Sequence, residues 1–509
     1  MLLFIVKKLL TKFLFFSIGL SVMNTTYKLI VFAVTGDCPA LSLITSFINH
    51  NGYYSCWHCF IKGESLGNKR QYPYQESSIR TPEEFSKLAA KAQRTNRNVY
   101  GHLGRSIVET LVEIPLPTSI ILDYMHVTLL GHAKNIILSI YRQMRPAERD
   151  HFNNCLKSQR FPRKFSVIFY FSFNSYTYLH QFHFGLDFFN RKMKSIDDFA
   201  FVKATEVRNV LFYGLPMHLH SMLPTDKYAH LVLYVCALRL LHSGNILRDE
   251  TSVVAHHLLS IFHEDHGLFY DGIESFKLHL HSHYASMYEN YGSLCNLGCF
   301  GQESLIGFIS SNYHQICNYG DAITHYFNID FYIQNRKKEE TAVNGPYDQS
   351  SIPIIAFAPI KEFHSCVCDC EQLDSCGNIY SRFVIHNIMF HSLLYSRRKN
   401  SISYFVQYQS GGNLQDIKFG IIEFFFMLKS NAYALIRCHR LKSKFSDYFK
   451  RSAYYHSLKG PIDRFYYVLE KEHYRIDFVP IDCIANHCIS AEKDDHLIVS
   501  IIWSYDEHD

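Results

Sequence analysis

The sequence predicts a mixed α/β fold followed by a small β-rich C-terminal domain. Three observations support this prediction. A short apolar run at residues 29–34 reads as a buried strand that ends at Thr35-Gly36-Asp37, and Pro39 then starts a helix. Between residues 123 and 144 apolar side chains recur at helical spacing. Beyond residue 377 the pattern changes to short β-prone runs at fairly regular intervals, which indicates a separate domain.

The composition is that of a folded chain. Hydrophobic residues make up 48% of the 509 residues and charged residues 19%, which excludes a mainly disordered protein. The net charge of +5 permits a nucleic-acid partner without requiring one. Fifteen cysteines, an odd number at irregular spacing, argue against a secreted disulfide framework. Their coincidence with 30 histidines raises the question of metal binding at particular positions.

Residues 1–27 form an apolar segment of uncertain role. The run from Phe13 to Met23 follows lysines 7, 8 and 12 and loosely resembles a signal peptide. It is too short for a spanning helix and no alanine-type cleavage site follows cleanly, so a buried amphipathic helix or a misplaced start codon is the better interpretation. No later segment reaches about 18 uninterrupted apolar residues, and we expect no membrane partner.

Start and stop signals order the rest of the chain. Thr81-Pro82-Glu83-Glu84 combines an N-cap, a first-turn proline and a capping-box glutamate, which predicts a helix over 83–94. Further helices are expected at 40–47, 123–144, 225–243, 251–263 and 273–291. The polar stretch 335–376 is the best linker between a core at 28–334 and the domain at 377–509. The β-prone runs in that domain are 379–392, 403–409, 417–428, 432–438, 465–469 and 497–503.

Three acidic residues are candidates for catalysis. Asp37 stands just past a predicted strand, where α/β active sites collect, although on this fragment alone an ordinary N-cap is the commoner explanation. Asp123 and His126 are three apart on a helix and share a face, so they could bind a metal or a phosphate, or serve as a cap and a packed histidine. Glu303 opens an apolar helix, where a first-turn glutamate is also favoured by the helix dipole.

Cysteine and histidine residues supply the metal candidates. Cys56 and Cys59, in a CxxC pattern, bring two thiolates to one ion, but a tetrahedral zinc site needs two more ligands; a redox or merely structural pair is the alternative. His126 is one potential partner for the pair. His279, His281 and His283 are others, although on a helix the three side chains would point in different directions.

Taken in order, these motifs resemble the transposases of CACTA-type (En/Spm-like) DNA transposons and host proteins derived from them. The matching elements are Asp37-Cys38-Pro39-Ala40, Cys56-Trp57-His58-Cys59, Leu122-Asp123-Tyr124-Met125-His126, the His-rich helix before Tyr291-Gly292, and Glu303-Ser304 with Gly307. The resemblance covers about residues 28–320 and implies an RNase H-like core with a mainly helical insertion. It also implies DNA cleavage and strand transfer at an acidic triad, with two Mg²⁺ ions in an active enzyme.

The resemblance assigns roles residue by residue. Asp37 matches the second acidic residue of the triad, and Glu303 is the candidate for the last. Asp123 and His126 match the Asp-x-Met-His element, and Asp123 is carried as a further catalytic candidate. Cys56 and Cys59 match an inserted zinc-type pair, whose partners would be His126 or His279 and His283. A nuclear location follows from the resemblance, with transposon-end DNA and a second copy of the chain as partners.

One departure from the family bears on activity. The first acidic residue lies on a strand upstream of the Asp-x-Pro-Ala element, but none of the 36 residues before Asp37 is acidic. We therefore expect an N-terminally truncated, catalytically defective transposase relative, because a two-metal site short of a bridging carboxylate is strongly impaired. The alternative is a non-enzymatic, zinc-stabilised module that binds nucleic acid or protein.

Overall fold

The computed structural model combines helices and strands, in agreement with the predicted α/β class. The residues it describes are 20–22, 25–27, 30–162, 195–244, 246–270, 272–311, 324–326, 328–329, 344–350, 358–367, 377–386, 388–395, 403–409 and 417–502. The chain divides into two compact units. Unit 1 comprises residues 1–145, 202–211 and 230–301, and unit 2 comprises 146–201, 212–229 and 302–509.

Two short parallel strands organise unit 1. β3 (Val34–Gly36) pairs with β6 (Ile120–Leu122), and Gly36 lies opposite Leu122. The residues that follow the two strands, Asp37 and Asp123, therefore stand at the same edge, since parallel strands end on the same side. α2 (Cys38–Ile44) follows directly and is capped by Asp37, whose Oδ1 accepts a hydrogen bond of 2.7 Å from the amide of Ala40.

The predicted strand at 29–34 is placed too early. Within the described residues only Val34 of that run belongs to β3, and Val31 makes a single parallel bridge to Val112. Ile30 and Phe32 are 44% and 60% exposed, so this part of the run lacks the partner that a buried strand needs. Before it, β1 (Leu20–Val22) pairs antiparallel with β2 (Thr25–Tyr27). Residues 1–19, most of the apolar N-terminal segment, lie outside the described residues.

Helices make up most of the remainder of unit 1. α8 (Thr225–His242), which runs from unit 2 into unit 1, is buried at every residue from Tyr228 onward and carries apolar side chains on all sides, as a central helix should. The other helical segments are α3 (Pro82–Thr95), the π-helical η2 (Met125–Ala133), α4 (Lys134–Gln143), α6 (Ala204–Asn209), α9 (Thr251–Glu264), α10 (His266–Phe269), α11 (Phe276–Leu280), the 3₁₀ turn η8 (His281–His283) and α12 (Tyr284–Tyr291).

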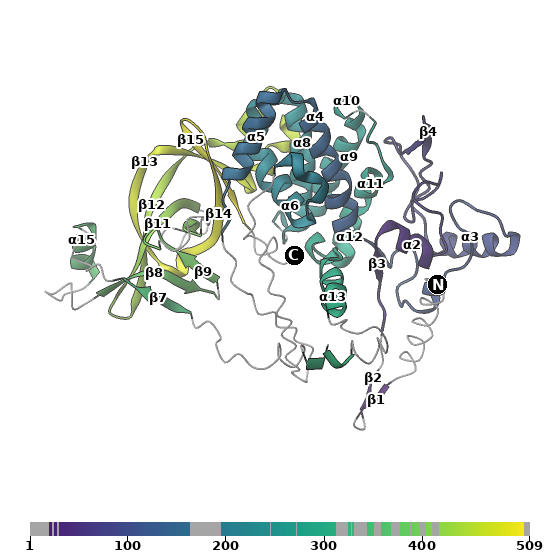
Figure 1. The fold of residues 1–509 in the computed structure, drawn as a ribbon, viewed down its shortest axis with the longest axis horizontal. Coiled ribbons are helices and arrows are strands. Elements are labelled where there is room, and N and C mark those ends of the chain that lie inside the picture. The colour runs from purple at the N-terminus through teal and green to yellow at the C-terminus, as the bar shows by residue number, and fades with distance from the viewer. Residues whose placement is uncertain are drawn as a thin grey trace. The chain divides into compact units, whose positions relative to one another are not determined.

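Six antiparallel strands of unit 2 close into a cylinder (Figure 1, green to yellow). The order is β10-β14-β15-β13-β12-β11, and β11 pairs back with β10 to complete the ring. Their bounds are β10 (Phe405–Gln409), β11 (Ile417–Leu428), β12 (Asn431–Lys444), β13 (Tyr466–Pro480), β14 (Ile484–Glu492) and β15 (His496–Ile501). Closure leaves no unpaired edge in the ring, and its buried clusters are rich in Phe, Ile and Val.

The linker prediction is wrong in part. Within 335–376, β7 (Gly345–Gln349) pairs with β8 (Gly377–Ile385), and α15 (Ala358–Val367) inserts the buried Ile360 into a cluster with β11 and β12. Sequence patterning misses β7 because its side chains are mostly exposed and it contains Gly and Pro. β9 (Ile388–His391) pairs with the other half of β8. Strand β14 was also missed, and β12 and β13 extend beyond the predicted runs.

The unit boundary also differs from the predicted one. Segments 146–201 and 212–229, expected in the core, belong with the cylinder. The hydroxyl of Tyr466 donates to the carbonyl of Phe212, and the ring of Tyr228 lies 5.1 Å from that of Phe449. α5 (Pro146–Ser158) and α7 (Leu215–His218) lie within these two segments and belong to unit 2. Among the described helices none has the length and apolar character needed to span a bilayer.

The predicted capping box is confirmed. The Thr81 hydroxyl accepts a hydrogen bond from the Glu84 amide, and the Glu84 carboxylate accepts one from the Thr81 amide, both at 3.2 Å. We predict that Thr81→Ala lowers the free energy of unfolding by about 1 kcal/mol, because the Glu84 amide in the first turn of α3 loses its acceptor. Urea denaturation followed by circular dichroism measures this. Thr95→Ala, at the other end of the helix, is the control and should change stability by less than half as much.

Candidate metal centre and acidic edge

Two cysteines and two histidines converge in the interior of unit 1. The Sγ atoms of Cys56 and Cys59 and the ring nitrogens of His279 and His283 all lie within 4.8 Å of one another. Cys56 Sγ is 3.3 Å from His283 Nε2, and Cys59 Sγ is 3.3 Å from His279 Nε2. The two Nε2 atoms are also 3.3 Å apart. All four residues are at most 7% exposed, so the group is a closed, four-ligand arrangement that could hold a metal ion.

The two cysteines lie on a loop that is anchored by the buried side chain of Trp57. Trp57, between them, is fully buried, and its indole N–H donates to the Thr45 hydroxyl at 3.2 Å. Cys59 makes an antiparallel bridge to Ile79. With Trp57 anchored between them, both thiols face the two histidine nitrogens, and the four atoms lie within 4.8 Å of one another.

Helical spacing brings the two histidines to this loop. His279 and His283 are four residues apart, at the end of α11 and in η8, and therefore point to one side. His281, two residues from each, points elsewhere and contacts the hydroxyls of Thr128 and Tyr234 at 3.1 and 2.9 Å. The prediction that the three histidines diverge is therefore correct for His281 but wrong for the other two.

A buried arginine, for which no sequence pattern is a signal, supports the cysteine loop. Arg80 is 2% exposed, and its Nε donates to the carbonyls of Cys56 and Cys59 at 3.1 and 2.9 Å. Its Nη2 donates to the carbonyl of Tyr100 at 2.9 Å, and Nη1 lies 3.4 Å from His102 Nε2. By fixing both carbonyls, Arg80 fixes the directions of the two thiols, which is the part that residues behind metal ligands commonly play.

The environment sets the protonation of this group. Burial, followed by the charge of His283, lowers the pKa of His58 to about 3. Burial also lowers the pKa of His279, so it is a neutral imidazole with a lone pair for a metal. The hydrogen bond from Cys56 lowers the pKa of the Cys59 thiol and favours its thiolate. A thiolate and neutral imidazoles are the forms that bind metal ions.

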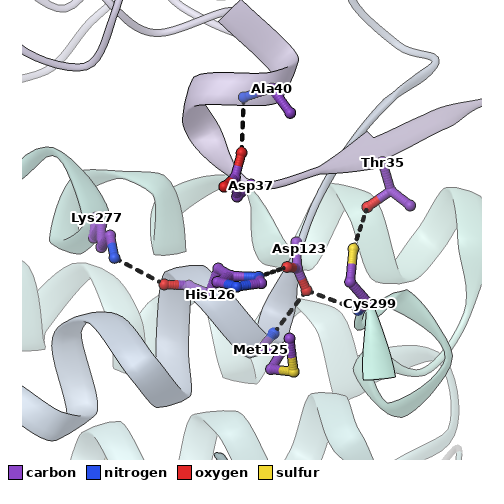
Figure 2. A network of polar contacts seen from close by, with 8 residues as sticks. All are labelled: Thr35, Asp37, Ala40, Asp123, Met125, His126, Lys277 and Cys299. Atoms are coloured by element: carbon purple, nitrogen blue, oxygen red, sulfur yellow. Dashed lines mark hydrogen bonds and ion pairs between the residues drawn. The ribbon is translucent and has the colours of Figure 1, made fainter. Parts of the chain in front are cut away.

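His126 does not belong to this group, contrary to expectation. Its Nδ1 hydrogen bonds to Oδ2 of Asp123 at the strand edge, and its carbonyl accepts from Lys277 Nζ at 3.0 Å (Figure 2). The metal candidates that the structure brings together are therefore Cys56, Cys59, His279 and His283.

Asp123 is fully buried and its carboxylate is engaged on both oxygens. Oδ1 accepts hydrogen bonds of 2.9 Å from the amides of Met125 and Cys299, while Oδ2 contacts His126 (Figure 2). Burial alone would raise the pKa of Asp123, but the contacts with His126 and the two amides outweigh it and the pKa is lowered. Asp123 therefore serves as a charged anchor that ties η2 to the segment before α13 (Phe300–Ser311).

Two of the three acidic candidates, Asp37 and Asp123, follow paired strands of unit 1. Asp37 stands at the edge beside Asp123 and caps α2 (Figure 2). Glu303 lies in unit 2, exposed in the first turn of α13. Within the described part of the chain, Asp37, Asp123 and Glu303 are not members of any group of three potential metal ligands, so Mg²⁺ at an acidic triad is not supported.

A second cluster of histidines fills the helical core. His132 is fully buried, with ring-centroid distances of 5.0 Å to His266 and 5.6 Å to His281. Neither ring nitrogen of His132 or His266 has a hydrogen-bond partner. Burial lowers the pKa of His132 well below its ordinary value and those of His266 and His230 to about 3. These rings are neutral packing groups, as predicted for most of the histidines.

Comparison of the sequence with models of known protein families and with curated proteins finds no match.

The buried histidines predict acid sensitivity. Their folded-state pKa values lie below the unfolded value of about 6.5, so the unfolded chain binds protons first. Stability is complete above pH 6.5 and falls as the pH drops toward 3, by about 1.4 kcal/mol per pH unit for each histidine. Urea denaturation between pH 7.5 and 5 should show this slope. His266→Gln should reduce the slope of the unfolding free energy against pH by about 1.4 kcal/mol per pH unit, the contribution of one histidine. His257→Gln, at an exposed position of α9, should leave the slope unchanged.

Proposed function

We propose that this chain is a transposase-derived, zinc-stabilised DNA-binding protein that is catalytically defective in DNA cleavage. The single observation that carries the proposal is the four-ligand group of Cys56, Cys59, His279 and His283, which joins the cysteine pair to the His-rich helix of the same resemblance. Binding of DNA and a location in the nucleus rest on the resemblance together with the net charge of +5.

Zinc is the metal that suits this group. Two thiolates with two imidazoles form a tetrahedral set typical of structural zinc. Zn–N and Zn–S bonds of about 2.0–2.3 Å place ligand atoms about 3.3–3.8 Å apart on the edges of a tetrahedron. The three distances of 3.3 Å between the sulfur and nitrogen atoms fit these edges. Four protein ligands leave no open position for a substrate, so the role is structural rather than catalytic.

The acidic edge favours an inactive RNase H-like core. The β3-α2-β6 arrangement, with Asp37 after one parallel strand and Asp123 after its neighbour, supports such a core. The carboxylate of Asp123, however, already hydrogen bonds to two backbone amides and to His126. A carboxylate that is fully buried and engaged in this way cannot also bridge two Mg²⁺ ions without breaking these bonds.

We predict one zinc ion per chain in purified protein, measured by inductively coupled plasma mass spectrometry. Cys59→Ser and His279→Ala should each lose the metal and unfold unit 1, because the binding free energy of the ion stabilises the fold. His281→Asn and Cys38→Ser are matched controls, of the same residue types and in the same unit but outside the group, and should keep one zinc. A protein that folds equally well after treatment with a chelator, and never contains zinc, would contradict the proposal.

Arg80 offers a graded test of the same site. Arg80→Met keeps the length of the side chain but removes the donors to the carbonyls of Cys56 and Cys59. Competition with a chromogenic chelator should show zinc affinity reduced about 10- to 100-fold while the metal can still bind. Arg105→Met, at an exposed position of the same unit, should leave the affinity unchanged.

The cleavage defect is tested separately. Wild-type protein incubated with supercoiled plasmid and Mg²⁺ or Mn²⁺ should show no nicking above that of Asp37→Ala, while both proteins shift duplex DNA equally in a gel-retardation assay. Robust cleavage that disappears in Asp37→Ala would show that the acidic edge is active and would overturn the defective assignment.

A further inference from the structure

Helix α3 of unit 1 carries a row of positive side chains on its outer face. Lys87, Lys91 and Arg94 follow one another at spacings of four and three residues, so they lie in one stripe along the helix. All three are exposed, as is Arg97 just past the end of the helix. We refer to Lys87, Lys91 and Arg94 as the cationic stripe.

The opposite face of α3 is fixed to the interior of unit 1. Phe85, Ala89 and Ala92 are at most 1% exposed, and the ring centroid of Phe85 lies 4.4 Å from that of His102. Directly before the helix, Arg80 donates to two carbonyls of the cysteine loop. Because α3 is held at its start and along its inner face, a partner that binds the stripe does not have to order this backbone.

The segment that carries the stripe has an excess of positive charge. Glu83 and Glu84 stand in the first turn of α3, but no residue from 85 to 108 is acidic, whereas five are Lys or Arg. One of the five, Arg105, pairs with Glu109 at 3.7 Å. Among the residues that the structure describes, no carboxylate forms an ion pair with the three cations of the stripe. Their charge is therefore available to an anionic partner.

The length of the stripe fits the backbone of duplex DNA. At a rise of about 1.5 Å per residue, Lys87 and Arg94 are about 10 Å apart along the helix axis. Over that length one strand of B-DNA presents about three phosphates, one for every 3.4 Å or so. Three cations in a row can therefore meet three successive phosphates.

Two other anionic partners fit α3 less well. A helix that lies on an anionic membrane turns its apolar face toward the bilayer, but the apolar face of α3 is buried in unit 1. Proteins that bind single strands stack the bases on accessible aromatic rings, but the single aromatic residue of α3, Phe85, is buried. The charge and the lack of exposed apolar side chains together favour the phosphates of a duplex.

We propose that the cationic stripe of α3 contacts the phosphate backbone of duplex DNA without reading its sequence. The inference rests on the proposed function, because it requires that the chain bind DNA, and it extends that function by naming the surface. Each cation that neutralises a phosphate releases counterions from the DNA, so the contact appears as a dependence of affinity on salt concentration.

The test measures the affinity of the full-length protein for a short labelled duplex of arbitrary sequence, by fluorescence anisotropy at a series of salt concentrations. Lys87→Gln/Lys91→Gln should lower the affinity at least tenfold. It should also reduce the slope of log affinity against log salt concentration by about 1.8, which is about 0.9 for each contact removed. Glutamine forms helices about as well as lysine, and both positions are exposed, so the thermal unfolding midpoint should not change.

A second pair of lysines provides the matched control. Lys62 and Lys69 are exposed and lie in unit 1 outside the stripe. Lys62→Gln/Lys69→Gln removes the same two charges from the protein, so it separates the effect of position from that of net charge. It should change the affinity less than threefold and leave the salt dependence unchanged.

The outcomes distinguish this inference from the proposed function. If the wild-type protein does not bind the duplex, both fail. If it binds, but the α3 variant binds as tightly or the control variant is weakened as much, the stripe is ruled out while DNA binding stands. The choice of partner is overturned if a single strand of the same length, or vesicles of phosphatidylserine and phosphatidylcholine, bind more tightly than the duplex and lose that affinity in the α3 variant.

Discussion

The convergence of four buried ligand atoms is the constraint on which unit 1 depends. It joins a loop at residue 56 to a helix 227 residues later, across a segment part of which belongs to unit 2. Without an ion, Cys56 hydrogen bonds to His283 and Cys59 to His279, each at 3.3 Å. With an ion they become the strongest link between the cysteine loop and the helical core. Arg80 and Trp57 support this arrangement. Arg80 donates to the carbonyls of both cysteines, and Trp57 donates to Thr45, so the loop keeps both thiols directed inward.

Asp123 provides a second, weaker link of a similar kind. Its carboxylate draws together the end of β6, the start of η2 and the amide of Cys299, so a charge at the mouth of two strands organises backbone from distant parts of the sequence. This structural use of the charge accounts by itself for a buried carboxylate at the strand edge. The edge and the metal group are joined through α11, because Lys277 contacts the carbonyl of His126 and His279 is two residues further along.

Local signals in the sequence were sufficient for elements whose stability is local. The capping box at Thr81 and Glu84, the helices from 225 to 291 and the long strand β11 lie close to their predicted places because caps and apolar periodicity define them. The cysteine pair could be recognised from its CxxC spacing. Its histidine partners could not, because periodicity alone does not say which of His279, His281 and His283 faces the cysteine loop. Arg80 and β7 gave no signal, since an isolated arginine and an exposed edge strand look like ordinary loop residues.

The closed ring of unit 2 has a consequence for how the domain is made. β10 pairs with β11, the next strand along the chain, and with β14, about 80 residues later, so the first strand of the ring has one local and one distant neighbour. During synthesis β10 to β13 can form a meander as they emerge, but that sheet keeps open edges until β14 and β15 arrive. Exposed edges invite pairing with other chains. The last two strands therefore close the sheet, and until they are synthesised the nascent chain exposes strand edges to other chains.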